Sequence, residues 1–209
     1  PNIYTGTGSS NSQTGLGFQP DWTWIKSRSN TYSNVLIDAV RGVGSTISSN
    51  SGNAAYSSPT EITSFDSDGF TLGTDSGVNN NASTFVSWNW KANGAGSANT
   101  DGSINTDSTS VNTTAGFSIC KWTGTGSNAT IGHGLGVAPK MIIVKNISTS
   151  DSWNVYHESL GNGKRLFLDT TGGESSTSDA WNSTSPTTSV FSVGTNTGTN
   201  GSGNTLIAY

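Results

Sequence analysis

The residues of this chain that could carry out chemistry are few and scattered. The two histidines, His133 and His157, lie in dissimilar contexts, and neither has a cysteine or a second histidine at a metal-binding spacing. The single cysteine, Cys120, excludes an intramolecular disulfide, and its apolar surroundings favour a small buried side chain over a reactive thiol. No phosphate-binding loop or nucleophile with a nearby base can be recognised. We therefore expect a protein that is not an enzyme, although a carboxylate pair for glycoside hydrolysis stays open.

One aspartate-rich segment could bind a metal ion. Asp66 and Asp68 lie two positions apart and precede Gly69, and oxygen ligands of this kind bind Ca²⁺ in many β-sandwich lectins. The same segment is typical of a tight hairpin turn, because Asp-Gly tolerates positive φ. We therefore name Asp66 and Asp68 as candidate metal ligands, with Ca²⁺ as the only cofactor suggested, and interpret the segment first as a turn.

Much of the first half of the sequence recurs in the second half. The stretch Tyr4–Ser9 (Tyr-Thr-Gly-Thr-Gly-Ser) returns with one change at Trp122–Ser127, and the Gly-Leu-Gly turn that begins at Gly15 returns at Gly134. The period is longer than those of solenoid repeats. The sequence therefore predicts two copies of one domain.

The composition indicates an all-β fold. Only 11% of the residues are charged and 31% are hydrophobic, while seven Trp, seven Phe and five Tyr supply large apolar side chains. Short apolar segments separated by Gly, Asn, Asp and Ser are typical of strands and turns. We predict two tandem antiparallel β-sandwich domains of jelly-roll or lectin-like type, at residues 1–92 and 116–209. A Gly/Ser/Thr/Asn-rich linker with a possible edge strand joins them at 93–115.

The same numbers limit the partners. A net charge of −4 leaves no basic surface for nucleic acid. No apolar run is long enough to cross a bilayer, and no basic amphipathic segment suggests a membrane surface. The chain starts at Pro1 without a methionine and stops inside what should be the last strand, so we expect it to be a fragment of a longer protein.

We interpret positions that match between the two halves as structural positions, which maintain the fold. Trp22 and Trp24 resemble a sugar-binding platform, but aliphatic residues occupy the matching positions of the second half, which favours core packing. Lys26 and Lys145 recur after matching apolar segments, and we expect both to reach solvent from the end of a buried strand.

Positions that differ between the halves are better candidates for function. Trp153, Trp181 and Tyr32 are aromatic residues outside the shared pattern, and aromatic rings can stack on the apolar faces of sugars. We therefore name these three as candidate carbohydrate-binding residues. The alternative is that they fill gaps specific to one half or form an interface between protomers.

Several blocks of sequence together resemble one family of repeat domains. They are residues 4–9, 15–26 and 64–73 in the first half, and residues 132–146 and 155–160 in the second. That family occurs in structural proteins of tailed bacteriophages, especially marine ones, often near lectin-like modules. The resemblance covers essentially the whole chain and carries no catalytic residues.

The resemblance implies a component of the virion surface, such as a tail fibre, a receptor-binding protein or a head-decorating protein. The leading hypothesis is therefore a non-enzymatic structural protein, assembled in the host cytoplasm, that contributes to host attachment. Its expected partners are other virion proteins, further copies of itself and a host surface glycan, with neither nucleic acid nor membrane insertion. Two alternatives stay open: a carbohydrate-binding lectin module and a polysaccharide depolymerase.

Overall fold

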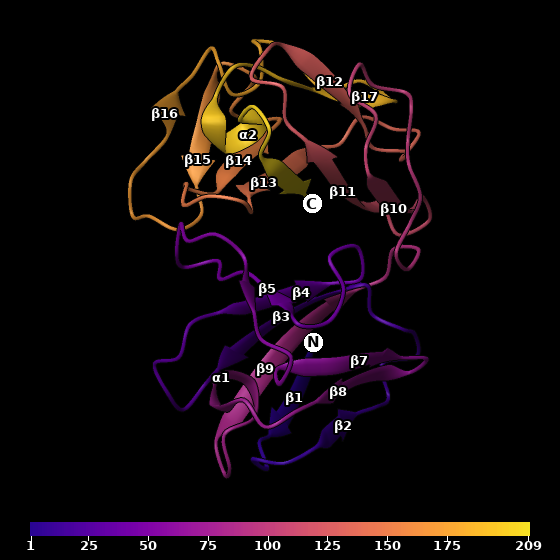
Figure 1. Ribbon diagram of the computed structural model, residues 1–209, viewed down its shortest axis with the longest axis vertical. Helices are drawn as coiled ribbons and strands as arrows, with labels where there is room; N and C mark the ends of the chain where they lie inside the picture. The colour runs from indigo at the N-terminus through magenta and orange to yellow at the C-terminus, as the bar shows by residue number, and fades with distance from the viewer. The chain divides into compact units, whose positions relative to one another are not determined.

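The computed structural model describes residues 1–209 and shows a nearly all-β protein, with 38% of the residues in strands and 4% in helices. The chain divides into two compact units (Figure 1). The first consists of Pro1–Asn50 and Ala55–Ala95, and the second of Ser51–Ala54 and Gly96–Tyr209. None of the helices has the length and apolar character needed to span a membrane. The predicted all-β class with a sandwich-like architecture is confirmed.

The first unit contains three antiparallel sheets and a single helical turn. Its elements are β1 (Asn2–Thr5), β2 (Asn11–Gln13), β3 (Trp22–Ser27), β4 (Val35–Asp38), β5 (Ser45–Thr46), β6 (Tyr56–Ser57), β7 (Ile62–Asp66), β8 (Gly69–Leu72), α1 (Ser76–Asn79) and β9 (Thr84–Trp90). The main sheet has the order β1-β9-β3-β4, the second sheet has the order β2-β8-β7, and β5 pairs with β6.

The core of the first unit follows from the alternation of side chains along its strands. Successive residues of a strand point to opposite faces, so Ile25 of β3 and Phe85 of β9 lie on one face of the main sheet. Both are fully buried and pack with Phe70 and Leu72 of β8 from the second sheet. The complete cluster is Tyr4, Ile25, Val35, Ile37, Ile62, Phe70, Leu72, Val78 and Phe85.

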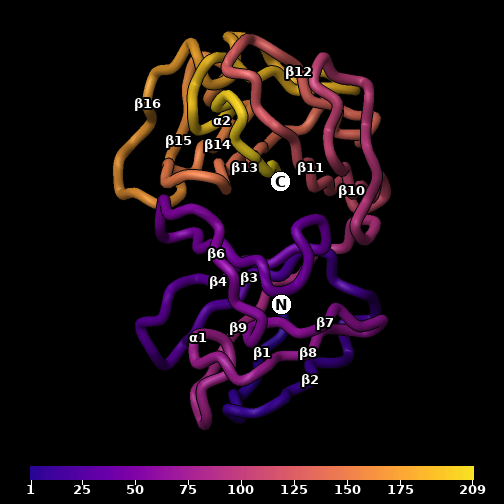
Figure 2. Tube along the Cα trace, viewed as in Figure 1, coloured from indigo at the N-terminus to yellow at the C-terminus, as the bar shows by residue number.

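The second unit is built around a longer sheet (Figures 1 and 2). Its elements are β10 (Ser108–Asn112), β11 (Phe117–Thr123), β12 (Ala129–Gly132), β13 (Met141–Asn146), β14 (Asn154–His157), β15 (Lys164–Phe167), β16 (Ser175–Ser176), β17 (Val190–Val193), α2 (Thr197–Asn200) and β18 (Thr205–Ala208). The main sheet has the order β10-β11-β18-β13-β14-β15-β16, and β12 pairs with β17. Its core contains Cys120, Trp122, Ile131, Ile142, Val144, Tyr156, Ala180, Trp181, Phe191, Val193, Leu206 and Ala208.

Each unit holds its helical turn with a buried asparagine at the last helical position. The Oδ1 atom of Asn200 accepts from the N–H of Thr125 at 3.0 Å. Its Nδ2 atom donates to the carbonyls of Ser127 at 2.6 Å and Gly194 at 3.0 Å. Asn79 makes the same three contacts in the first unit, with Thr7, Ser9 and Gly73 at 2.9, 2.6 and 2.6 Å.

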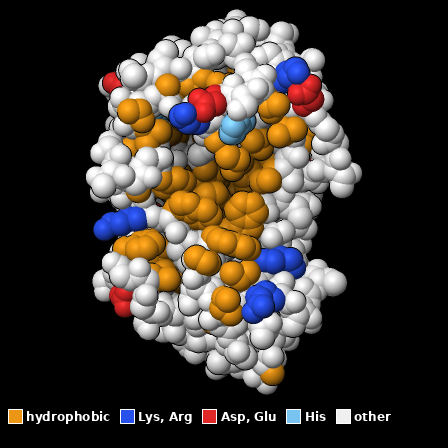
Figure 3. Space-filling model, turned by 180° about the vertical axis from the view of Figure 1, so that it is seen from behind, with side chains coloured by type: hydrophobic (Ala, Val, Ile, Leu, Met, Phe, Trp, Pro, Cys, Tyr) orange, Lys and Arg blue, Asp and Glu red, His pale blue; other side chains and the backbone are white.

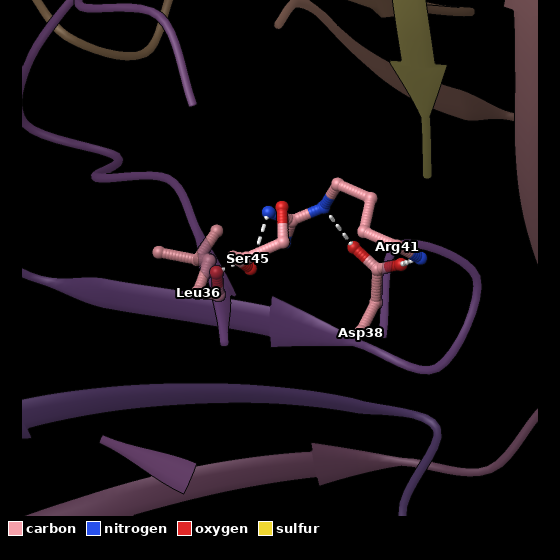
Figure 4. A network of polar contacts seen from close by, with 4 residues as sticks. All are labelled: Leu36, Asp38, Arg41 and Ser45. Atoms are coloured by element: carbon pink, nitrogen blue, oxygen red, sulfur yellow. Dashed lines mark hydrogen bonds and ion pairs between the residues drawn. The ribbon is translucent and has the colours of Figure 1, made fainter. Parts of the chain in front are cut away.

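A buried ion pair fixes the end of β4 in the first unit (Figure 4). The guanidinium of Arg41 contacts the carboxylate of Asp38 at 2.5 Å, and both side chains are almost completely buried. The remaining guanidinium nitrogens donate to the carbonyls of Ser45 at 2.8 Å and Leu36 at 2.9 Å. Because a buried charge is tolerated only when it is paired and hydrogen-bonded, this network fixes the turn that follows β4.

Candidate functional site

Four tryptophans gather on the outer face of the main sheet of the first unit. Trp22 and Trp24 lie on β3, directly opposite Trp90 and Trp88 on β9. The ring centroids are 4.4 Å apart for Trp22 and Trp90, 6.0 Å for Trp22 and Trp24, and 6.3 Å for Trp24 and Trp88. These spacings are those of favourable aromatic pairs. We call the four residues the tryptophan face.

The tryptophan face is graded in exposure. Trp22 is buried, Trp24 and Trp90 are half-buried, and Trp88 is 40% exposed. Hydrophobic side chains are also plainly visible on the surface of the molecule in Figure 3. Because exposed aromatic surface of this kind marks binding sites more often than scattered single residues do, Trp24 and Trp88 are the candidate contact residues.

The alternation along β3 explains why these rings lie outside the core. Ile25 points to the core face, so Trp24 and Lys26 on either side of it must point to the opposite face. Trp22 is buried, as expected for core packing, although it lies outside the main core cluster of the unit. The same expectation is corrected for Trp24, which is only half-buried and also lies outside that cluster. Trp88, on the same face of the neighbouring strand, is an exposed residue.

Polar groups border the tryptophan face. The indole N–H of Trp24 donates to Oδ1 of Asn34 at 3.2 Å, and the backbone N–H of Asn34 donates to Oδ1 of Asn50 at 2.8 Å. Lys26, on the same side of β3, donates from Nζ to the carbonyl of Tyr32 at 2.7 Å. The half-buried Tyr32, predicted as a carbohydrate-binding residue, thus belongs to the loop beside this face. Aromatic rings bordered by amides offer both the apolar and the hydrogen-bonding contacts that a sugar needs.

The other two predicted carbohydrate-binding residues lie inside the second unit. Trp153 is fully buried, and its indole N–H donates to the carbonyl of Ser51 at 3.1 Å. Trp181 belongs to the core cluster, donates to the carbonyl of Lys164 at 3.1 Å and packs edge-on against Tyr156 at 5.8 Å. Neither ring has a free face for a sugar to stack on, so the candidate site is corrected to exclude both.

A difference in spacing between the two halves explains why the sequence placed Trp181 outside the shared core pattern. In the first unit, Gly73 donates its N–H to the residue before Ile62, and in the second, Gly194 donates to the residue before Trp181. The backbone contacts therefore match Trp181 with Ile62, a fully buried core residue, and not with the polar residue suggested by sequence spacing.

The candidate metal ligands Asp66 and Asp68 hold a turn in place. Asp68 accepts from the N–H groups of Gly15 at 2.9 Å and Gly17 at 2.6 Å, and these backbone donors lower the pKa of its carboxyl. Asp66 accepts from the hydroxyl of Thr71 at 2.7 Å. No group of three or more His, Cys, Asp or Glu side chains in the structure could hold a metal ion.

Two buried groups of the second unit, Cys120 and Lys145, have strongly shifted pKa values. Cys120 is buried, as expected, and burial raises the pKa of its thiol to about 11. Lys145 is also fully buried, which corrects the expectation that it reaches solvent. Its ammonium donates to the carbonyls of Asn146 at 2.6 Å and Gly52 at 3.1 Å, while burial lowers its pKa to about 8.

Comparison with known proteins gives one finding about the whole chain. No curated protein and no solved structure matches it. A family model described as a domain of unknown function, DUF7483, matches residues 1–209, and the chain therefore belongs to that family.

Proposed function

We propose that this protein is a non-enzymatic surface component of a tailed-phage virion that contributes to particle structure and host attachment. It is assembled in the host cytoplasm with other virion proteins and further copies of itself, and it contacts a glycan of the host surface. The sequence blocks that resemble phage repeat domains support the virion assignment. The observation that carries the attachment role is the tryptophan face of the first unit.

The geometry of the tryptophan face suits an extended carbohydrate. The faces of a pyranose ring carry C–H groups, which pack against aromatic rings, while its hydroxyls need hydrogen-bonding partners. Trp24 and Trp88 offer two neighbouring rings with centroids 6.3 Å apart. Because both rings come from adjacent strands of one sheet, the surface is held in place before a ligand arrives, which lowers the entropic cost of binding.

We further propose that the two units are copies of one β-sandwich domain. The support for this proposal is that the same side-chain-to-backbone contacts occur in both units. Asn79 and Asn200 end matching helical turns and bind matching backbone groups at nearly equal distances. A duplicated scaffold of this kind lets one copy keep the structure while the other acquires a binding surface.

A glycan-array screen of the purified protein tests the attachment role. We expect binding to a surface polysaccharide that a Trp24→Ala/Trp88→Ala variant loses by about tenfold or more, because each tenfold is about 1.4 kcal/mol and stacked rings contribute about this much. Ile3→Ala is the matched control, since Ile3 is 64% exposed and its strand register places it on the same sheet face. Equal binding by all three proteins, or no glycan binding at all, would remove the tryptophan face from the proposal.

The virion assignment needs a separate measurement. Antibodies against the purified chain should label the surface of intact particles in immunogold electron microscopy. Glycan binding without such labelling would favour the alternative, a lectin module that acts outside a particle. Release of reducing ends from host capsule or lipopolysaccharide would contradict the non-enzymatic assignment and favour a depolymerase.

A further inference from the structure

The second unit contains a cavity that the proposed attachment role does not use. Its volume is about 430 Å³, within the range of roughly 300–1,000 Å³ that is usual for small-molecule sites. Residues of β11, β13, β17 and β18 line it together with residues 133–140, which connect β12 to β13. The cavity therefore lies beside the core of the unit, next to the turn that contains Gly134 and Gly136.

The walls of the cavity are apolar. Phe117 is a half-buried residue of the lining, and Leu135, Ile142, Phe191 and Ala208 are buried ones. Two further lining residues are exposed hydrophobic side chains, Val137 at 60% and Met141 at 50%. Exposed side chains of this size beside an apolar hollow are unfavourable in water, and an occupant would cover them.

Three polar side chains of the lining, those of Ser118, Cys120 and His133, are already hydrogen-bonded within the unit. Ser118 donates from Oγ to the carbonyl of His133 at 2.8 Å, and the thiol of Cys120 contacts a backbone carbonyl at 3.5 Å. The ring of His133 accepts at Nδ1 from the N–H of Leu135 at 3.1 Å and contacts the carbonyl of Thr187 from Nε2 at 3.2 Å. An occupant that required these groups would have to break existing bonds, so the lining favours one that forms none.

The charge at the cavity is confined to its rim. Lys140 is the only charged residue in the lining, its side chain is 75% exposed, and its ammonium pairs with the carboxylate of Glu158 at 3.0 Å. No charged side chain of the lining other than that of Lys140 is therefore present to neutralise an ionised ligand, and burying an unpaired charge there would be costly.

We propose that this cavity binds a small uncharged hydrophobic molecule, of the size of a compound with two or three aromatic rings. An apolar cavity of about 150 Å³ holds one benzene molecule, and this cavity has almost three times that volume. Its small lining favours a small molecule over a second protein, because a stable protein interface needs roughly 800 Å² of surface on each partner.

Titration with N-phenyl-1-naphthylamine, an uncharged fluorescent aromatic amine, tests this proposal on the whole protein. We expect saturable binding of one probe per chain, with the increased and blue-shifted emission of a probe in an apolar site. Leu135→Trp places a larger side chain in the cavity and should weaken binding at least tenfold. Leu16→Trp is the matched control, because Leu16 lies in the corresponding Gly-Leu-Gly turn of the first unit. It should bind as the unchanged protein does.

Ala138→Trp gives a second blocking variant at an exposed lining position, so that a folding defect in Leu135→Trp does not decide the result. Binding that survives in both blocking variants would overturn the proposal and would place the probe elsewhere, for instance on the tryptophan face. Absence of saturable binding would overturn it as well. Formation of dimers that the blocking variants prevent would show that a second copy, and not a small molecule, fills the cavity. None of these outcomes depends on glycan binding or on the presence of a virion.

Discussion

Replacement of Asn200 by alanine tests the contact that we regard as most important to the second unit. The Asn200 side chain is completely buried and connects α2 to the segment after β11 and to the backbone after β17. Alanine would remove one acceptor and two donated hydrogen bonds without introducing a new charge or a steric clash. The N–H of Thr125 and the carbonyl of Gly194 would then lose their side-chain partner.

The expected cost follows from the three bonds. They measure 3.0, 2.6 and 3.0 Å, which are normal to short distances for N–H···O bonds. Each is worth about 0.5–1.5 kcal/mol net, and a buried group left without a partner moves the cost toward the upper value. We therefore expect a loss of about 3 kcal/mol in the free energy of unfolding. For a unit of about 100 residues this corresponds to a fall of more than 10 °C in Tm.

Calorimetry and urea unfolding of matched variants provide the measurement. Asn79→Ala removes the same three bonds from the first unit, together with one that the Asn11 amide donates at 3.0 Å, and should cost at least as much. If the units unfold in separate transitions, each variant should shift only one of them. A loss below about 1 kcal/mol for either variant would refute the assigned strength of the contacts. A shift of the same transition by both variants would refute their assignment to separate units.

Three further predictions concern ionisable groups. Burial lowers the pKa of His133, although the Asp101 carboxylate acts in the opposite direction. The unfolded chain therefore takes up a proton at a higher pH than the folded chain does, and stability should fall as the pH drops below about 6.5. His133→Asn should lack this loss of stability in urea unfolding. Burial lowers the pKa of Lys145 to about 8. Stability should therefore increase as the pH rises from about 8 to 10.5, by up to about 1.4 kcal/mol per pH unit. Lys145→Met should lack this gain in the same assay. Asp68→Ala should accelerate amide hydrogen exchange at the two glycines whose N–H groups it binds, and the unchanged protein should lose the same protection as the pH falls through the lowered pKa of that carboxyl.

The fold class could be predicted from the sequence because its signals are local. Apolar segments separated by Gly, Asn, Asp and Ser specify strands and turns without knowledge of the partners. The turn around Asp68 could also be predicted from its local sequence. In the structure this turn joins β7 and β8 as a hairpin, and Gly69 adopts a φ of 159°. The helical turns are too short for a hydrophobic period, but Asp75-x-Gly-x-Asn79 and its partner in the second half carry the capping signal.

The face of the sheet that meets the core could not be predicted where both faces of a strand are apolar. In β3, the sequence Trp-Thr-Trp-Ile-Lys has large apolar residues at both parities, and only the position of β8 selects Ile25 as the core residue. The shared parity of Trp24 and Lys26 was the available signal that the indoles point outward. The capture of Ser51–Ala54 by the second unit depends on long-range contacts, for which the local sequence has no signal.

The two units differ in the number of strands beside one residue that lines the cavity, Phe191. Phe70 of β8 has a strand partner on each side, Gln13 of β2 and Phe65 of β7. Phe191 of β17 pairs on one side with Ile131 of β12 and has no strand at the position that β7 holds in the first unit. If the two units are copies of one domain, as we propose, the sheet that contains Phe191 has one strand fewer than its counterpart, while the main sheet has seven strands instead of four.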